Sequence, residues 1–287
     1  MREDLHNLFD CHMHTSFSGD CQVDPILQIR RGKELGLGGV TITDHLDLDY
    51  KEEPGLFDLD FPSYIEEISK LQKEESDESF QVGLGLELGL QEHLKEEHHN
   101  LLKKYPFDYV IGSIHVVNGV DPYYAPYFQD RSIVEAYTEY LEACLRNVNQ
   151  FHEFDSFGHL DYIARYGSHF YKDVPKKLDL KTYGGLVDAI LEALIRYDIA
   201  LEVNTAGFRH GLGNPNPSFE IITRYKELGG QLLTIGADAH RTEEVGLHFE
   251  NMAALLRECG FDSYAVFRNR KPEIYPLVSR MGKYRTF

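Results

Sequence analysis

The chain contains the stretch Leu232-Leu233-Thr234-Ile235-Gly236-Ala237-Asp238-Ala239-His240, an apolar run that ends in a carboxylate and an imidazole. Short aliphatic runs bounded by polar residues are typical of buried strands that lead into loops. The pattern recurs at Val82-Gly83-Leu84-Gly85-Leu86, which ends at Glu87, and at Tyr109-Val110-Ile111-Gly112-Ser113-Ile114, which ends at His115. Potential metal ligands at several distant strand ends indicate a fold in which those ends meet.

Apolar runs of this kind alternate with helical patterns along the chain. We expect strands near residues 7–13, 38–44, 80–87, 108–115, 154–159, 198–204 and 232–238. We expect helices near residues 24–36, 63–75, 92–104, 131–150, 179–197, 217–229 and 243–259. Seven strand-then-helix units predict an α/β fold with a mainly parallel sheet, and no linker rich in Pro, Gly or Ser divides it. The interpretation is a single barrel domain over residues 1–287, with its site at the C-terminal ends of the strands.

Composition narrows the class of protein. A chain of 287 residues fits one barrel or two smaller domains, and 42% apolar residues allow a substantial core. No apolar stretch reaches 18 residues, so no membrane span is expected. The first residues, 1–6, lack the apolar segment of a signal peptide, and the four cysteines form no C-x-x-C pair. These features favour a reduced, cytoplasmic protein.

The formal net charge of −18 argues against nucleic acid as a partner. Nucleic-acid affinity depends on Lys and Arg that neutralise phosphates, and no basic run exceeds two residues. A small substrate is therefore favoured. The sequence leaves open whether the chain is a monomer or a homodimer.

Six histidines and three carboxylates stand at or just after the expected strands. They are His12, His14, Asp20, His45, Glu87, His115, His159, Asp238 and His240. Each alone could be a satisfied polar residue or a helix cap. Together they predict a metal site, because each expected strand except the sixth ends at an Asp, Glu or His on the face where barrels carry their sites. By contrast, His98 and His99 belong to an acidic helix and are expected to face solvent.

The number and type of these ligands constrain the chemistry. Nine ligands exceed what one ion holds, so two or three divalent ions are needed. Imidazole and carboxylate without thiolate suit zinc, iron or manganese. Such a site makes hydroxide available near neutrality and can hold a phosphoryl group, which favours hydrolysis over redox chemistry.

The ordered motifs H-x-H, T-D-H, a strand-terminal Glu, S-I-H, G-H-L-D and D-A-H, over residues 12–240, resemble the polymerase-and-histidinol-phosphatase (PHP) family. That resemblance implies a distorted seven-stranded (β/α)7 TIM-like barrel with a trinuclear metal site. The branch that looks most similar is the histidinol-phosphate phosphatases of histidine biosynthesis. The segments that support this branch are 11–20, 158–166 and 202–207.

The resemblance implies how nine ligands divide among three ions. One ion would take His12, His14, Glu87 and Asp238, with Glu87 bridging. A second would take Glu87, His115 and His159, and a third Asp20, His45 and His240. In many relatives a histidine stands at the position of Asp20. Asp44 and Asp161 could orient their neighbouring histidines or could equally be helix caps.

A phosphorylated substrate also needs a fixed cation. Arg165, six residues beyond His159, is the best candidate because guanidinium binds phosphate oxygens in pairs. Arg209 is the second candidate and could equally be a surface residue. It lies in the breaker-rich loop 207–217, which is either an active-site loop or an ordinary connection.

The segment 121–128 is rich in aromatic residues and follows His115. Tyr123 could wall a pocket for an imidazole ring, and Asp121 could pair with an amine. The same segment could equally be a loop packed on the barrel rim. The stretch after Gly260 is expected to be a tail that lies across the barrel.

The leading hypothesis is a phosphomonoesterase that hydrolyses L-histidinol phosphate by attack of a metal-activated hydroxide. The leaving group would be protonated by His210, Asp44 or a metal-bound water. The alternatives are a PHP phosphoesterase acting on a phosphotyrosine protein, a nucleotide or an oligonucleotide, and a metal-dependent regulatory protein without catalysis.

Overall fold

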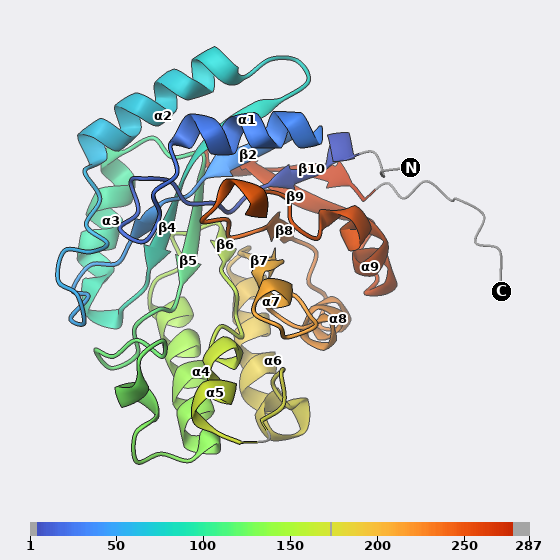
Figure 1. Cartoon of the computed structure of the whole chain (residues 1–287). Coiled ribbons are helices and arrows are strands. Elements are labelled where there is room, and N and C mark those ends of the chain that lie inside the picture. The colour runs from blue at the N-terminus through green and yellow to red at the C-terminus, as the bar shows by residue number, and fades with distance from the viewer. Residues whose placement is uncertain (1–4, 173, 278–287) are drawn as a thin grey trace, which may run out of the picture.

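A parallel sheet follows the chain in order in the computed structural model, which describes residues 5–172 and 174–277. Its seven successive strands are β1 (Phe9–Asp10), β2 (Gly39–Ile42), β4 (Gln81–Gly89), β5 (Tyr109–Ser113), β6 (Ser156–Phe157), β7 (Ala200–Asn204) and β8 (Leu233–Gly236). All pairs between neighbours are parallel, and helices surround the sheet (Figure 1). All seven expected strands are present.

The sheet closes on itself beyond the ends of its first and last strands. The Cys11 amide donates to the Ile235 carbonyl over 2.9 Å, and the Asp238 amide donates to the His12 carbonyl over 2.8 Å. A parallel bridge joins Met13 to Ala239. The result is the predicted seven-stranded barrel, in which the residues after β1 lie beside those after β8.

The strand β2 continues, after an interruption, as β3 (His45–Leu46), and both pair with β4. At the interruption the Thr43 amide donates to the Met13 carbonyl over 2.9 Å instead of pairing with β4. The Met13 amide in turn donates to the Thr43 hydroxyl over 3.0 Å. The break therefore links the histidine segment after β1 to the one after β2.

The longer helices follow the strands as predicted. They are α1 (Pro25–Leu35), α2 (Phe61–Glu75), α3 (Lys95–Lys104), α4 (Ile133–Gln150), α6 (Leu180–Arg196) and α8 (Phe219–Glu227). The cap expected for α1 is present, because the Ile26 amide donates to the Asp24 carboxylate over 3.1 Å and Pro25 occupies the first turn. Two short helices were not predicted, α5 (Ala164–Phe170) and α7 (Ala206–Arg209). Earlier in the chain there are also short 3-10 helices at Leu5–Asn7, Glu92–Leu94 and Ala125–Phe128.

The helix predicted over residues 243–259 is wrong for its first half. Only α9 (Met252–Glu258) is α-helical, and it follows two 3-10 turns, Thr242–Glu244 and Phe249–Asn251. Gly246 has a φ of 62°, a left-handed conformation that interrupts a right-handed helix. No helix within the described ranges is long and apolar enough to cross a membrane.

The stretch after Gly260 forms a hairpin and not the expected tail. Its antiparallel strands are β9 (Ser263–Arg268) and β10 (Lys271–Pro276), and whatever lies beyond Leu277 falls outside the described residues, as do residues 1–4. Phe267 stacks on Tyr109 at 5.5 Å between ring centroids, and the Asn269 amide donates to the Asp108 carboxylate over 3.1 Å. These contacts lie where the barrel strands begin, so the hairpin covers the end opposite to the predicted metal ligands.

The expectation that His98 faces solvent is also wrong. His98 lies on α3 and is 1% exposed, with its ring 5.5 Å from that of Phe151. Burial lowers the pKa of this imidazole to about 4, so it is neutral at pH 7. His99, its neighbour, is partly exposed and lies 2.8 Å from the Glu153 carboxylate.

Candidate metal centre

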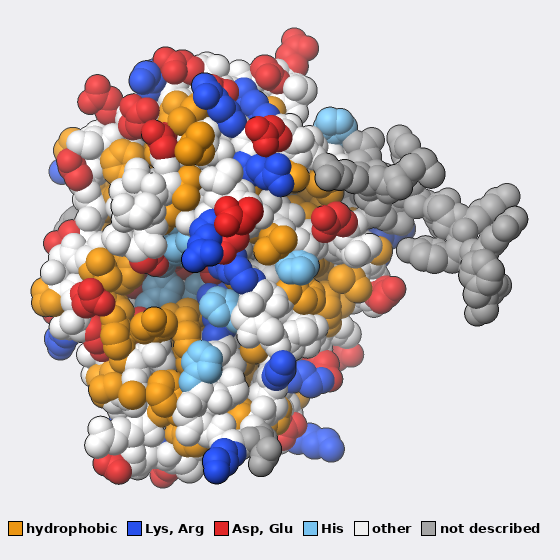
Figure 2. Space-filling model, in the orientation of Figure 1, with side chains coloured by type: hydrophobic (Ala, Val, Ile, Leu, Met, Phe, Trp, Pro, Cys, Tyr) orange, Lys and Arg blue, Asp and Glu red, His pale blue; other side chains and the backbone are white. Residues whose placement is uncertain are grey.

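The predicted ligands gather at one end of the barrel, around a cavity of roughly 790 Å³. Figure 2 shows the hollow on this face, with histidine side chains at its floor and basic side chains beside acidic ones at its edge. Apart from His12 and His14, which lie deeper, all the predicted ligands line this cavity. Ligands drawn from strand ends across 229 positions of sequence, 12–240, thus share one site.

The first group joins ligands from three strand ends. The Nε2 atoms of His12 and His14 lie 3.1 Å apart. Glu87 Oε2 lies 3.2 Å from His12 Nε2 and 3.4 Å from His14 Nε2, while Asp238 Oδ1 lies 3.4 Å from His14 Nε2. All four side chains are buried. Two imidazole nitrogens and two carboxylate oxygens that converge in this way fit a divalent cation.

The second group surrounds the other oxygen of Glu87. Glu87 Oε1 lies 2.9 Å from His159 Nε2 and 3.3 Å from His115 Nε2, and these two nitrogens are 3.4 Å apart. His45 Nδ1 also lies 3.1 Å from Glu87 Oε2. Glu87 therefore stands between the first and second groups, as a bridging carboxylate would.

The third group is more exposed and lies at the edge of the cavity. Asp20 Oδ2 lies 3.1 Å from His240 Nε2 and 3.8 Å from His45 Nε2. The His14 ring stacks between those of His45 and His240, each at 4.1 Å. The three groups are thus continuous, and His14 and Glu87 link them.

In four of the six histidines, a fixed partner at Nδ1 leaves Nε2 aimed at the cluster. His12 Nδ1 lies 2.5 Å from Glu202 Oε1, His14 Nδ1 3.2 Å from the Ser18 hydroxyl, His115 Nδ1 2.9 Å from Asp47 Oδ1 and His240 Nδ1 3.0 Å from the Asp238 carbonyl. A partner on one ring nitrogen fixes the orientation and tautomer that present the other to a metal. This repeated arrangement is expected of metal ligands and not of histidines that merely fill space.

A buried oxygen supports the same interpretation. Glu87 Oε2 is buried without a hydrogen-bond partner among the described residues, although imidazole nitrogens surround it. A buried carboxylate oxygen without a partner is costly. Burial raises the pKa of Glu87, but His12, His45 and His115 hold it well below its ordinary value. The oxygen is therefore ionised and oriented toward positions that a cation would occupy.

Two buried carboxylates that hold the ligands were not predicted. Asp47 lies 2.9 Å from His115 Nδ1 and 3.4 Å from His45 Nδ1. Burial raises its pKa, but His115 lowers it to about 2, so Asp47 is ionised. Glu202, on β7, lies against His12 and accepts a hydrogen bond from the His159 amide over 2.7 Å. The sequence features that could have indicated them are the position of Asp47, two residues after His45, and the presence of Glu202 inside the otherwise apolar strand Ala200–Asn204.

Close packing fixes the position of Asp47. A Cβ atom added at Gly89, at the end of β4, would lie 1.9 Å from Asp47 Oδ1. Any side chain larger than that of glycine at position 89 would displace the Asp47 carboxylate. The end of β4 therefore supplies both Glu87, which lies between two of the ligand groups, and the space for Asp47 beside two histidines.

Arg165 lies at the wall of the cavity, on α5. Its Nε donates to Asn216 Oδ1 over 2.9 Å, and its Nη2 donates to Asp238 Oδ2 over 3.1 Å. Burial opposes its charge, but Asp238 raises the pKa of Arg165, so it remains a cation. Nη1 has no hydrogen-bond partner within the described ranges.

Arg209 lies on α7 at the cavity edge and is 23% exposed. Its Nη2 donates to the Asp238 carbonyl over 2.9 Å, and its Nη1 lies 3.2 Å from Glu244. Both expected arginines therefore line the cavity beside Asp238. Their guanidinium groups supply fixed positive charge next to the metal ligands.

Neither Asp44 nor Asp161 contacts the ring of its neighbouring histidine. Asp44 accepts hydrogen bonds from the Thr15 amide over 2.6 Å and from the Ser18 hydroxyl over 2.7 Å, and it does not line the cavity. Asp161 accepts from the Ser218 amide over 3.1 Å, at the start of α8. Asp44 thus acts on His14 only through Ser18, whereas Asp161 caps a helix from a distant loop. His210 does line the cavity.

Aromatic rings form the rest of the cavity wall. Tyr123 is 59% exposed and lies 5.5 Å from Tyr166. Asp121 is 5% exposed, accepts from the Tyr50 hydroxyl over 2.8 Å and from the Tyr123 amide over 2.7 Å, and burial raises its pKa to about 6. Both oxygens of Asp121 are therefore already engaged by the protein. Tyr123 lines the cavity as expected, while Asp121 chiefly holds the loop.

Comparisons with known proteins agree with this geometry. A sequence model of the PHP domain matches residues 10–206. A probable histidinol-phosphatase of Clostridium acetobutylicum is 35% identical over 256 residues, which is 88% of this chain and 94% of the relative. The histidinol-phosphatase of Lactococcus lactis is 34% identical over 264 residues, 91% of this chain and 95% of the relative.

Solved structures show the same fold. The crystal structure of the Lactococcus lactis histidinol phosphate phosphatase, in complex with zinc, L-histidinol and phosphate, superposes with a TM-score of 0.85 at 32% identity. The alignment covers 93% of this chain and 99% of that one. The matched domain, 10–206, includes the predicted ligands as far as His159, while Asp238 and His240 lie beyond it.

Proposed function

This chain belongs to the PHP domain family, and from that premise we propose that it hydrolyses L-histidinol phosphate to L-histidinol and inorganic phosphate. The observation that carries the proposal is the convergence of six imidazoles and three carboxylates beside a buried arginine. The substrate is inferred from relatives of nearly the same length, one of which was solved with zinc, L-histidinol and phosphate.

We propose that the site holds three divalent ions, zinc, iron or manganese, with the donors divided as the sequence motifs imply. The first would be held by His12, His14, Glu87 and Asp238, the second by Glu87, His115 and His159, and the third by Asp20, His45 and His240. Bound ions would lower the pKa of water enough to supply a nucleophile near neutrality and would neutralise phosphoryl oxygens.

The protein's own residues would orient the substrate. Arg165 is held on one side by Asn216 and Asp238, which leaves Nη1 to donate to a phosphate oxygen. A guanidinium fixed before binding loses little entropy when it engages the transition state. Arg209, which also contacts Asp238, would supply a second cation.

For the leaving oxygen we propose His210, which lines the cavity outside the nine ligands. Burial and the nearby Arg165 lower the pKa of His210, so the ring is neutral at pH 7. A neutral imidazole donates through one nitrogen and accepts through the other, so it can pass a proton from solvent to the leaving alkoxide. Asp44 does not suit this role because its oxygens are occupied by Thr15 and Ser18.

Phosphate release from L-histidinol phosphate tests the proposal directly. The purified chain, supplied with zinc or manganese, should have a kcat/KM for this substrate at least 100-fold above that for p-nitrophenyl phosphate. A phosphotyrosine peptide, a nucleoside monophosphate and an oligonucleotide complete the set. Equal turnover of the first two substrates, or faster turnover of any other, would contradict the substrate assignment while leaving the fold in place.

A further inference from the structure

The cavity contains one acidic side chain with a free oxygen that neither the metal groups nor contacts among the described residues use. Six carboxylates line it: Asp20, Glu53, Glu87, Asp121, Asp238 and Glu244. Three of them belong to the metal groups described above. Both oxygens of Asp121 accept hydrogen bonds from the protein, and Glu244 lies against Arg209 and the His240 amide. Glu53 remains.

Glu53 is held by one oxygen only. The Tyr124 hydroxyl donates to Glu53 Oε1 over 2.7 Å, and Oε2 has no partner in the part of the chain that the structure describes. The residue is exposed at the cavity edge, in the loop between β3 and α2. One anchored oxygen and one available oxygen are what a carboxylate needs to accept a hydrogen bond from a ligand.

Two rows of aromatic rings begin at the predicted metal ligands, and one of them ends beside Glu53. On one side Phe57 lies 4.9 Å from the His45 ring and Tyr50 lies 4.9 Å from Phe57. On the other side the rings succeed one another at 5.0–5.5 Å, in the order His159, Tyr162, Tyr166, Tyr123 and Tyr124. The second row ends at the Tyr124 hydroxyl that holds Glu53.

The proposed substrate has a phosphate at one end and an aromatic ring at the other, in the same order as the predicted metal ligands and the aromatic side chains of the cavity. A phosphate at the metal ligands would place the flat imidazole ring of L-histidinol phosphate at the other end of the molecule. Aromatic faces favour a flat ring that is partly cationic near neutral pH. A carboxylate at the end of an aromatic wall would accept the ring N–H.

We propose that Glu53 is a specificity-determining residue, whose free carboxylate oxygen accepts a hydrogen bond from the imidazole of the substrate. This inference rests on the proposed function and adds Glu53 to the imidazole recognition that the sequence suggested for Tyr123. Glu53 takes no part in bond cleavage. Its removal should therefore affect imidazole-bearing ligands and spare other phosphate esters.

The test compares Glu53→Ala and Glu53→Gln with the wild-type holoenzyme on three substrates. L-Histidinol phosphate carries both the imidazole and the amine. 2-Aminoethyl phosphate carries the amine without the imidazole, and p-nitrophenyl phosphate carries neither group. We expect the KM for L-histidinol phosphate to rise about tenfold in Glu53→Ala, as for the loss of one charge-assisted hydrogen bond, with smaller losses in Glu53→Gln. Kinetic constants for the other two should change less than twofold.

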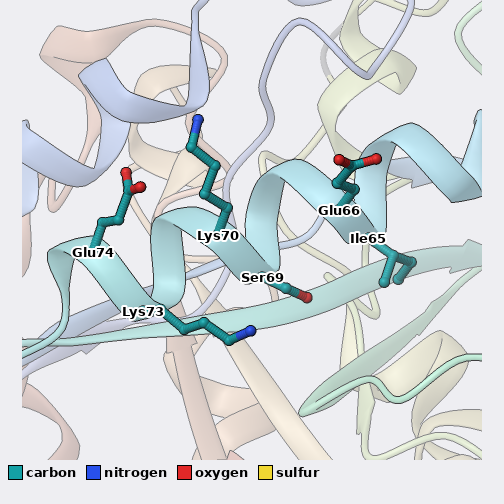
Figure 3. A pocket seen from close by; sticks show the side chains of 6 residues that line it. All are labelled: Ile65, Glu66, Ser69, Lys70, Lys73 and Glu74. Atoms are coloured by element: carbon teal, nitrogen blue, oxygen red, sulfur yellow. The ribbon is translucent and has the colours of Figure 1, made fainter.

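Glu66→Ala is the matched control. Glu66 lies on α2, beside a shallow surface hollow lined by residues of that helix, and does not line the main cavity (Figure 3). It is exposed, like Glu53, so the same substitution removes one surface carboxylate. We expect wild-type kinetics on all three substrates.

A second experiment tests the role of Glu53 independently of the proposed function. It measures how strongly L-histidinol inhibits the hydrolysis of p-nitrophenyl phosphate. The inhibition constant should rise about tenfold in Glu53→Ala, even if L-histidinol phosphate proves a poor substrate. Unchanged inhibition and unchanged KM would overturn the role of Glu53. Equal losses on all three substrates would overturn it as well, because they would indicate damage to the metal centre.

Discussion

Single side chains carry two different tasks at the metal centre. The nine predicted ligands direct nitrogen and oxygen atoms toward one another, whereas Asp47 and Glu202 contact the Nδ1 atoms of His115 and His12. Replacement of a ligand removes a donor atom. Replacement of the residue that orients a ligand leaves all donors in place but still weakens metal binding. The residue-scale predictions exploit this difference.

Arg165→Lys should lower kcat/KM for L-histidinol phosphate about 100-fold. Lysine keeps the charge but cannot contact Asn216 and Asp238 while also donating to a phosphate oxygen. Steady-state kinetics measure the loss. Arg209→Lys is the comparison, with a smaller loss because Arg209 is more exposed. If the two variants were equally active, Arg165 would have no special part in phosphate binding.

Asp47→Asn should weaken metal binding about 10- to 100-fold, because the neutral amide no longer stabilises the His115 and His45 imidazoles in their present orientation. Competition with a chromogenic chelator measures the affinity without reference to activity. Asp49→Asn is the control, since Asp49 is 43% exposed and forms ion pairs, among the described residues, with Lys51 and His93 alone.

Gly89→Ala provides a second route to the same result. The added Cβ would lie 1.9 Å from Asp47 Oδ1, so this carboxylate must move. Metal affinity should fall as in Asp47→Asn. Wild-type affinity in both variants would show that Asp47 does not position the ligands.

At the scale of secondary-structure elements, one end of the barrel carries the predicted metal site and the other end is covered by a hairpin. The ends of all the barrel strands except β7 carry the predicted ligands, while the β9–β10 hairpin covers the strand starts. Residues of the hairpin should therefore matter for stability and not for catalysis.

Phe267→Ala should lower the free energy of unfolding by about 3–5 kcal/mol, because it removes a 4% exposed ring that stacks on Tyr109. Chemical denaturation measures the change. The folded variant should keep wild-type kcat/KM. Ile274→Ala, on the paired strand β10, is the control, because Ile274 is 58% exposed and its truncation should cost little.

His98 on α3 gives a pH-dependent prediction. Its pKa falls from 6.5 to about 4 on burial, so the folded state binds this proton less tightly than the unfolded state. The stability due to the neutral ring is complete above pH 6.5 and is lost as the pH falls toward 4, by about 3 kcal/mol. Denaturation of wild type and His98→Leu across this range measures the difference. Parallel curves would contradict the prediction.

Element order and ligand positions were predictable for one physical reason. A buried strand leaves an apolar run in the sequence, and the residue after it marks the strand end, as Glu87 and His115 do. The contacts of Asp47 and Glu202 were not predictable, because they join residues 68 and 190 positions apart. The β9 strand was missed although Tyr264-Ala265-Val266-Phe267 has a strand composition.

Charge connects the metal centre to the whole molecule. The chain carries a formal net charge of −18, which includes the ionised cavity carboxylates Glu87 and Asp238, whose charge burial alone would disfavour. Cations bound among them would offset this repulsion at the point where it is strongest. Folding and metal binding should therefore be linked across the molecule.

Removal of metal should lower the melting temperature as well as abolish phosphatase activity. An ion present at 1,000 times its dissociation constant stabilises the folded state by about 4 kcal/mol, and several ions shared through Glu87 should act together. Protein dialysed against a chelator, then against zinc or manganese, can be followed by calorimetry and by elemental analysis. We expect three ions per chain and recovery of the melting temperature together with activity. Fewer than two ions per chain would contradict a metal centre built from all nine ligands, because at least two of the three groups would then hold their buried charges without cations. A melting temperature insensitive to the chelator would contradict it as well, because bound ions must stabilise the folded state.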